Sequence, residues 1–299
     1  MEEAPQPFGY RSRARVQRRG FGPKSKVGFF RLQSHELEDI ESCPLFRPLL
    51  NEALDSVRQT CRNASYDPGP QQFELACSQE EGTWGTAAAL ELDEDFSANR
   101  GMDEPEGEPV ILRRRIGDFS YSVSPSVFFQ ANDYLVEKMV ERVGELAQTS
   151  GSVAALDLYS GVGLFTLPLA RRFQNVVAVE SSILASRLCT QNATEAGLSN
   201  VTTISARALD WMQTMAADVQ QPFDLVLLDP PRSGAGAEVM KHLSDWAPDT
   251  IVYVSCDPHT MIRDLTCLNP GDYQIDSVEG LDLFPQTYHF ESLVRLRRR

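Results

Sequence analysis

The pattern of hydrophobic and polar residues changes near residue 120. Over residues 11–17 polar and apolar side chains alternate, as they do in a half-exposed strand. Residues 43–62 carry apolar side chains at helical spacing, with Pro44 near the expected start of a helix. Strands are also expected over residues 27–32, 72–76, 86–92 and 110–114, and the acidic stretch 93–109 is expected to be a loop. Residues 1–120 are therefore predicted to form a small α+β domain.

After residue 120, short apolar runs alternate with amphipathic stretches. Five strands are expected over residues 153–159, 176–179, 201–204, 223–228 and 250–254, and two more near the C-terminus. Helices are expected over residues 132–147, from the glycine turn after the first strand to residue 170, and over 183–196, 237–244 and 259–267. Apolar strands separated by helices predict a mostly parallel, doubly wound α/β sheet over residues 121–299, as in Rossmann-like domains.

Residues that could bind a ligand stand where these strands are expected to end. Tyr159 follows the first strand and precedes a glycine turn, and Glu180 ends the second strand. Asp229 and Cys256 follow the fourth and fifth strands. In open α/β sheets, ligands bind beyond the carboxyl ends of the strands. The four residues therefore predict one site at this edge.

The turn after the first strand has the features of a cofactor site. Gly161 and Gly163 allow a ligand to approach the backbone and expose amides at a helix N-terminus. The third glycine of a dinucleotide fingerprint is absent, because Thr166 occupies its place. Glu180 can accept hydrogen bonds from both ribose hydroxyls of NAD or of S-adenosylmethionine. The ribose site alone leaves both cofactors open.

Two later motifs favour group transfer over hydride transfer. The prolines of Asp229-Pro230-Pro231-Arg232 fix a turn beyond the fourth strand, which hydride-transfer enzymes seldom need there. Asp257 and Pro258 predict that a helix starts directly after Cys256. The positive end of that helix favours a thiolate, whereas the charge of Asp257 opposes it. Cys256 is therefore predicted to be a nucleophile.

Composition places the chain among globular proteins. It has 299 residues, of which 42% are hydrophobic and 23% charged, and it has no apolar run long enough to cross a bilayer. The six cysteines form no C-x-x-C pair, which argues against a disulfide scaffold and a zinc ribbon, and no metal site is expected. The arginine-rich N-terminus has no apolar signal region, so a cytoplasmic protein without a membrane partner is expected.

The charge distribution modifies this picture. A net charge of −14 argues against a nucleic-acid partner, but binding depends on where the charge lies. Basic residues are concentrated between residues 10 and 31, at 113–115 and at 295–299, whereas acids are concentrated over 91–108. These clusters support a local basic face.

Six segments, in order along the chain, resemble motifs of the RNA 5-methyluridine methyltransferases, which use S-adenosylmethionine to methylate C5 of uridine in tRNA and ribosomal RNA. The segments are YRSR (10–13), FFQAN (128–132), LDLYSGVG (156–163), DPPR (229–232), VSCDP (254–258) and FPQTYHFES (284–292). The resemblance covers the chain from Tyr10 onward. It implies a central α+β RNA-contacting domain followed by an S-adenosylmethionine-dependent methyltransferase domain.

The resemblance also implies a role for each site residue. Cys256 would add to C6 of uracil, so that C5 attacks the methyl group, and Glu291 would remove the C5 proton. The cofactor would be held by Gln130, Tyr159, Glu180 and Asp229. His289 is expected to share a strand face with Glu291 and to have a structural or substrate-positioning role. The target uridine would have to leave its stack to reach Cys256.

Some family features have no counterpart in this sequence. The family's N-terminal β-barrel and cysteine-ligated iron–sulfur region are not expected, and Leu164 stands where relatives carry a polar residue near the cofactor. No obligate protein partner is evident. Three alternatives stay open: a methyltransferase acting on an exocyclic amine, an inactive RNA-binding relative, and, less favoured, an NAD-dependent oxidoreductase.

Overall fold

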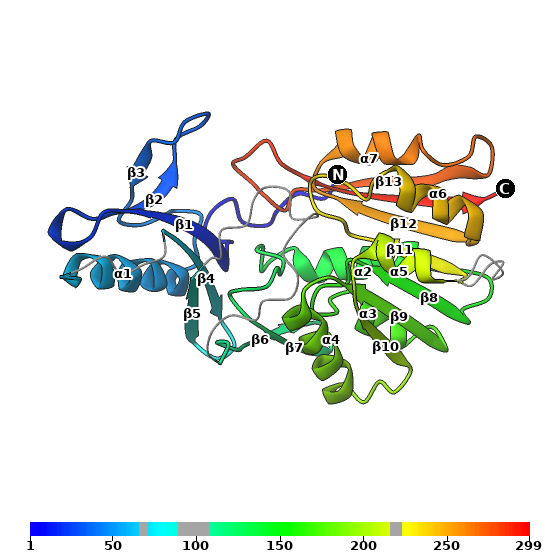
Figure 1. The fold of residues 1–299 in the computed structure, drawn as a ribbon, viewed down its shortest axis with the longest axis horizontal. Coiled ribbons are helices and arrows are strands. Elements are labelled where there is room, and N and C mark those ends of the chain that lie inside the picture. Colours follow the sequence, from blue (N-terminus) through cyan, green and yellow to red (C-terminus); the bar gives the residue numbers. More distant parts are fainter. Residues whose placement is uncertain (66–70, 89–107, 216–222) are drawn as a thin grey trace.

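The computed structural model describes residues 1–65, 71–88, 108–215 and 223–299. A small five-stranded sheet with one helix forms the N-terminal part, and a seven-stranded sheet with helices on both faces forms the larger part (Figure 1). In the described ranges, no helix is long and apolar enough to cross a membrane.

The N-terminal sheet is antiparallel throughout, with the strand order β3-β2-β1-β4-β5. Its strands are β1 (Arg13–Arg19), β2 (Lys26–Phe30), β3 (Leu37–Asp39), β4 (Gln72–Ser78) and β5 (Thr83–Ala88). β3 was not expected from the sequence. The expected strand over residues 86–92 is observed as β5 up to Ala88, and its remainder lies outside the described residues, as does the expected acidic loop up to residue 107.

Helix α1 (Pro48–Asn63) packs against one face of this sheet through Leu50, Leu54 and other buried apolar side chains. It begins at Pro48, so the prediction that it starts near Pro44 was wrong. The backbone carbonyl of Pro44 instead accepts a hydrogen bond from the amide of Gly9, at 2.9 Å. Pairing with this earlier segment holds residues 44–46 outside the helix, and Pro48 provides the fixed φ of a first helical residue.

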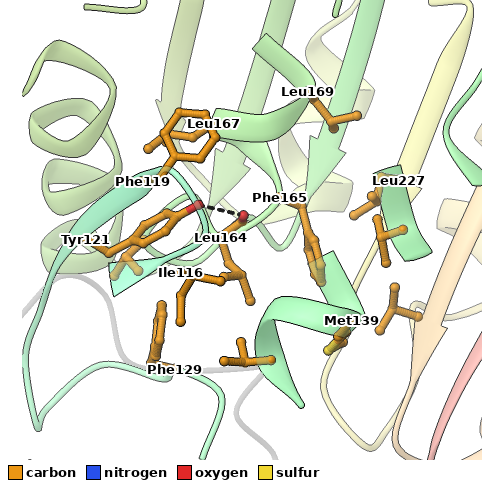
Figure 2. Packing of buried hydrophobic residues seen from close by; sticks show 14 of the residues in the cluster. Ile116, Phe119, Tyr121, Phe129, Met139, Leu164, Phe165, Leu167, Leu169 and Leu227 are labelled. Carbon is orange, nitrogen blue, oxygen red and sulfur yellow. Dashed lines mark hydrogen bonds between the residues drawn. The ribbon is translucent and has the colours of Figure 1, made fainter. Parts of the chain in front are cut away.

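A separate hairpin, β6 (Leu112–Ile116) and β7 (Phe119–Val123), joins the two parts. Its apolar side chains lie in the same core as those of the seven-stranded sheet. The hydroxyl of Tyr121 in this core donates a hydrogen bond to the carbonyl of Leu164 at 3.0 Å (Figure 2). The hairpin is thus attached to the segment that follows the glycine turn.

The seven-stranded sheet has the order β10-β9-β8-β11-β12-β14-β13. Its strands are β8 (Ala154–Leu158), β9 (Asn175–Glu180), β10 (Val201–Ser205), β11 (Leu225–Leu228), β12 (Thr250–Ser255), β13 (Tyr273–Leu281) and β14 (Glu291–Arg298). The first five are parallel, and β14 runs antiparallel to both of its neighbours. The predicted mostly parallel, Rossmann-like sheet is confirmed.

Helices cover both faces of this sheet, because successive strand residues point to opposite sides. One apolar cluster contains residues of α2 (Val136–Leu146), α3 (Thr166–Ala170) and α4 (Ile183–Glu195). The other contains residues of α5 (Ala208–Thr214), α6 (Ala237–Trp246) and α7 (Pro258–Leu265). α5 was not predicted, and α2 begins four residues later than expected because Asn132 accepts hydrogen bonds from the amides of Tyr134 and Leu135 in a turn.

Candidate active site

The sheet topology brings the predicted site residues to one edge. β8 and β11 are far apart in sequence but pair side by side, and Leu158 is aligned with Val179 and with Leu228. The residues after these three strands therefore meet where the strand order reverses, which is the ligand-binding position of such sheets. β14 begins at the same edge, since Ser255 at the end of β12 pairs with Ser292. Glu291 thus lies beside the segment that carries Cys256.

The turn after β8 is built for close packing. Tyr159 has a φ of 64°, and Gly163 has a φ of 94°. A Cβ atom on Gly163 would lie 2.9 Å from both Cys189 Sγ and Leu167 Cδ1. A larger residue at this position would push the turn away from the helices beneath it, so the glycine is required by both conformation and space.

Glu180 holds this turn from the neighbouring strand. Its Oε2 accepts a hydrogen bond from the amide of Gly161 at 3.0 Å. Its Oε1 accepts one from the amide of Ser182 at 2.7 Å, and the Ser182 hydroxyl caps α4 by accepting from Ala185 at 3.3 Å. The carboxylate is therefore fixed beside the glycine turn, where the sequence predicted a ribose acceptor.

Two buried oxygen atoms at the same turn fit a polar ligand. Asp157 Oδ1 and Ser160 Oγ have no hydrogen-bond partner in the part of the chain that the structure describes. The other oxygen of Asp157 accepts from the Thr166 hydroxyl at 2.6 Å, and burial raises the pKa of Asp157 to about 7. Buried polar atoms normally have a hydrogen-bond partner, so two unpartnered oxygen atoms beside a glycine turn suit a cofactor with polar groups.

Glu291 is close enough to Cys256 to affect the ionisation of its thiol. Glu291 is 3% exposed, and burial followed by the charge of Asp229 raises its pKa well above the ordinary value. Burial followed by the charge of Glu291 raises the pKa of Cys256 to about 11. The expectation that the helix end favours a Cys256 thiolate in the free protein was therefore wrong. Desolvation and neighbouring acids outweigh the dipole.

The chain around Cys256 is fixed by its neighbours. Ser255 Oγ donates to the carbonyl of Asp257 at 2.8 Å and accepts from the Asp257 amide at 3.1 Å. The Asp257 carboxylate caps α7 by accepting from the amides of His259 and Thr260, at 2.8 and 3.4 Å. The predicted start of a helix at Pro258 is confirmed.

Arg232 is a site residue to which the sequence analysis gave no role. Its positive charge opposes the upward pKa shifts of Cys256 and Glu291, and, after burial, it contributes to the lowered pKa of His289. Asp229, three residues earlier, has its pKa raised to about 8 by burial and by Asp157. The signal for Arg232 was present in the sequence, because it is the only cation in the turn after β11.

The three other segments of the resemblance lie close together. The side-chain amide of Asn132 donates a hydrogen bond to the backbone carbonyl of Leu283 at 3.0 Å. The hydroxyl of Tyr10 donates one to the backbone carbonyl of Pro285 at 3.1 Å. Gln130, two residues from Asn132, is buried. These bonds place residues 128–132 beside the segment that leads to Glu291.

One expectation about a neighbouring residue changes, and the structure places a second residue in the core. His289 precedes β14 and stacks on Tyr288 at 4.1 Å between ring centroids, so it does not share a strand face with Glu291. The Leu164 side chain is 7% exposed and packs with the hydrophobic core (Figure 2). In the described ranges, no group of three or more His, Cys, Asp or Glu residues could hold a metal ion.

Residues 111–299 match the sequence profile of the tRNA (uracil-5-)-methyltransferases. The chain belongs to this family. A 23S rRNA (uracil(1939)-C(5))-methyltransferase RlmD of Klebsiella pneumoniae subsp. pneumoniae is 35% identical over 98% of the chain and 71% of its own length. An RNA methyltransferase of Thermotoga maritima is 38% identical, over 64% of the chain and 42% of its own length.

A solved structure of the family supports the same fold. The tRNA (uracil-54, C5)-methyltransferase of Pyrococcus abyssi, in complex with S-adenosyl-L-homocysteine, matches 99% of this chain and 78% of its own chain, with a TM-score of 0.74 and 27% identity. S-adenosylmethionine is therefore the cofactor of the family fold that this chain adopts. The alternative of an NAD-dependent oxidoreductase is set aside.

Proposed function

We propose that this protein transfers a methyl group from S-adenosylmethionine to C5 of a uridine in RNA. The observation that carries the proposal is the meeting of Cys256 and Glu291 at the edge that also holds the cofactor turn. A methyltransferase acting on an exocyclic amine needs neither a thiol nor a buried base. The proposal also agrees with the uracil-C5 activity in the names of the relatives.

Four residues are proposed to hold the cofactor, which supplies an electrophilic methyl group when bound. Glu180, already fixed beside the turn, accepts from the ribose hydroxyls, and Tyr159 and Asp229 lie at the same edge of the sheet, directly after their strands. Gln130 completes the set from the segment packed against Leu283. The unpartnered oxygens of Asp157 and Ser160 are further acceptors for its polar groups.

Cys256 is proposed to start the reaction. Its sulfur forms a bond to C6 of uracil, the thiol proton is released, and the C5–C6 π electrons move towards C5 and O4. C5 then forms a bond to the methyl carbon, while the cofactor sulfur keeps the electron pair of the bond that breaks. Because the pKa of Cys256 is about 11 in the free protein, proton loss has to accompany attack or follow a change caused by RNA binding.

Glu291 is proposed to finish the reaction. As a carboxylate it removes the proton from C5, the electrons re-form the C5–C6 double bond, and the C6–sulfur bond breaks to restore the Cys256 thiolate. Its burial beside Asp229 raises its proton affinity, which suits a base that must accept a proton from carbon. Arg232 counteracts this pKa shift and so favours the deprotonated form of Glu291.

The N-terminal part is proposed to contact RNA. The side chains of Arg19 on β1 and of Lys26 on β2 are exposed. Cations on one region of an acidic protein attract phosphates locally even when the net charge is negative. The relatives act on both rRNA and tRNA, so either RNA is a candidate substrate.

The activity is tested by incubating the protein separately with bulk tRNA and bulk rRNA and with labelled S-adenosylmethionine, followed by nucleoside analysis. Labelled 5-methyluridine is expected from one of the two RNA pools. A labelled exocyclic amine would instead identify the alternative methyltransferase. Binding of RNA without transfer would identify an inactive relative.

The roles of Cys256 and Glu291 are tested in the active RNA pool. Glu291→Gln should still attack and methylate but release RNA slowly, so a methylated covalent complex should accumulate on denaturing gels. Cys256→Ala should give no turnover and no complex while still binding the cofactor. A complex that persists in the Cys256→Ala/Glu291→Gln double variant would exclude Cys256 as the attacking residue, and wild-type turnover by Glu291→Gln would exclude the proposed base.

A further inference from the structure

The helix that follows Cys256 carries a fully buried carboxylate that has no part in the proposed chemistry. Asp264 of α7 is 0% exposed. Its Oδ2 accepts hydrogen bonds from the hydroxyl of Tyr253 and the amide of Ala235, both at 2.6 Å. Its Oδ1 accepts from the amide of Gly236 at 3.3 Å and from the guanidinium of Arg263 at 2.8 Å. A buried charge needs such a set of donors, and this one draws them from three different segments.

Two of those donors belong to the loop that follows Asp229. The amide of Gly234 bonds to the carbonyl of Pro231 at 2.8 Å, so residues 231–234 form a turn with Arg232 at its corner. The amides of Ala235 and Gly236, bound by Asp264, come directly after this turn. Arg263 also donates to the carbonyl of Ser233 at 2.6 Å. The loop that carries Arg232 is thus attached to α7 through Ser233, Ala235 and Gly236.

The loop packs directly on the carboxylate. Gly234 has a φ of 84°, and a Cβ atom on it would lie 2.4 Å from Asp264 Oδ2 and 2.5 Å from an Arg263 nitrogen. No side chain fits between the loop and α7. The position of the loop therefore depends on the position of this one carboxylate.

The other partners of Asp264 belong to the segment that carries the nucleophile. Tyr253 lies in β12, three residues before Cys256, and α7 starts at Pro258, two residues after Cys256. The same carboxylate therefore bonds to the strand before the nucleophile, to the helix after it and to the loop that presents Arg232. Arg232 in turn acts on Cys256 and Glu291 across the site.

We propose that Asp264 is a positioning residue that holds the Arg232 turn in register with Cys256. This inference rests on the proposed function of Cys256 and Glu291. Asp264 itself contacts neither the substrate nor the cofactor. Its effect on methyl transfer passes through the loop backbone to Arg232.

The test is Asp264→Asn in the full chain, with single-turnover methyl transfer to RNA measured from acid to alkaline pH. The asparagine amide has one acceptor oxygen, and its NH₂ group must face a donor, so the loop is released from α7. We expect the rate per active site to fall by about ten-fold to a hundred-fold near neutral pH, the size of effect produced by a slightly misplaced reacting group. The profile should also move to higher pH, because Arg232 no longer lowers the pKa of Cys256.

The matched control is Asp224→Asn. Asp224 also accepts from two backbone amides, those of Val153 at 2.7 Å and Ala154 at 2.9 Å, but at the opposite edge of the same sheet. This variant should lose stability while keeping the wild-type rate per active site and pH profile. Equal kinetics in the two variants would show that Asp264 is merely structural and would overturn the inference.

Two further variants keep the test informative if Asp264→Asn fails to fold. Gly234→Ala displaces the loop and leaves the carboxylate intact, and Arg263→Gln removes the bond to Ser233 from a half-exposed side chain. Both should shift the pH profile in the same direction as Asp264→Asn, and neither shift should add to that of Arg232→Gln. Additive shifts, or none, would overturn the inference. Absence of 5-methyluridine with the wild-type protein would instead overturn the proposed function.

Discussion

Burial and two neighbouring acids raise the pKa of Cys256 to about 11 in the free protein. Burial comes first, followed by the charge of Glu291, and the charge of Asp229 adds to both. Arg232 is the cation that acts against them. The reactive forms of both Cys256 and Glu291 are deprotonated, so we expect methyl transfer to become faster as pH rises through neutrality.

The first prediction concerns Arg232. In Arg232→Gln the pKa values of Cys256 and Glu291 should both rise, because the cation that lowers them is gone. The pH–rate profile for kcat/KM should therefore move to higher pH, and the loss of activity should be greatest at low pH. Activity is measured at saturating cofactor, with the exposed Arg187→Gln as the control. A uniform loss at all pH values would indicate that Arg232 only binds RNA.

The second prediction concerns Glu180. Glu180→Ala removes the proposed ribose acceptor and also frees the amide of Gly161. Cofactor affinity, measured by calorimetry, should weaken by about 1.5–3 kcal/mol, as for hydrogen bonds to a charged group. Glu238→Ala, on the exposed first turn of α6, should leave affinity unchanged. Wild-type affinity in Glu180→Ala would place the ribose elsewhere.

For individual residues, the sequence predicted which candidate site residues stand at strand ends, because a buried strand ends where its apolar run ends. Glu180 and Asp229 were found in this way. The ionisation of Cys256 was not, since it depends on Glu291, which is adjacent only through the antiparallel placement of β14. Roles of the individual residues stay predictions until the variants are measured.

Among the elements, α7 links local sequence to the position of the nucleophile. Its N-cap, Asp257, follows Cys256 directly and accepts from two amides of the first turn. An eight-residue helix gains little from its own propensity, so the cap and the buried Met261 and Asp264 determine where it starts.

The third prediction is that Asp257→Ala lowers stability by about 0.5–2 kcal/mol, the usual cost of losing an N-cap. It should also slow attack by Cys256, because the capped turn fixes the backbone around it. Denaturant unfolding and covalent-complex formation are compared with Ser182→Ala, which removes the cap of α4. Ser182→Ala should lose stability without slowing attack, so equal kinetics in both variants would contradict the role of the α7 cap.

Element boundaries followed the sequence where an apolar run ended at a turn residue, as at Glu180 and Pro258. They differed where distant contacts decide. α1 starts late because Pro44 pairs with Gly9, and the seven-residue α5 has only Ala208 and Met212 buried, too few for a clear periodic pattern. The antiparallel direction of β14 could not be predicted, because strand direction in a sheet is set by the whole topology.

For the molecule as a whole, burial of acids at the catalytic edge makes stability depend on pH. The pKa of Asp157 is raised to about 7 and that of Asp229 to about 8. Between about pH 4, where aspartates of an unfolded chain titrate, and pH 8, the folded protein therefore holds more protons than the unfolded one. Stability contributed by these groups is complete at the acidic end of this window and is lost as pH rises through it.

The fourth prediction follows from this dependence. Asp229→Asn removes a half-buried carboxyl whose pKa is raised, so the melting temperature of the variant should rise relative to that of the wild type as pH increases from 5 to 8. Each pKa unit corresponds to about 1.4 kcal/mol, so even part of the shift is measurable. Asp245→Asn, on the exposed face of α6, should show no such trend. A melting difference that stays constant with pH would contradict the raised pKa.

The predicted division of the chain near residue 120 stays a proposal. Residue 120 lies within β7, whose hairpin packs in the core of the larger sheet, and the family match begins at residue 111. We therefore propose that the hairpin belongs to the methyltransferase part and that the division lies just before it. The hydrophobic pattern did not reveal this, because the alternation of apolar and polar residues in a two-stranded hairpin is the same whichever core the hairpin packs against.

The placement of β14 has a consequence for how the protein is made. β14 is synthesised after β12 and β13 but lies between them in the finished sheet. A growing chain therefore cannot close the sheet by adding strands outward, and β12 remains an edge with Cys256 at its tip until the last strand inserts. Because that same strand brings Glu291, the proposed nucleophile and the proposed base come together only once β14 has paired with β12.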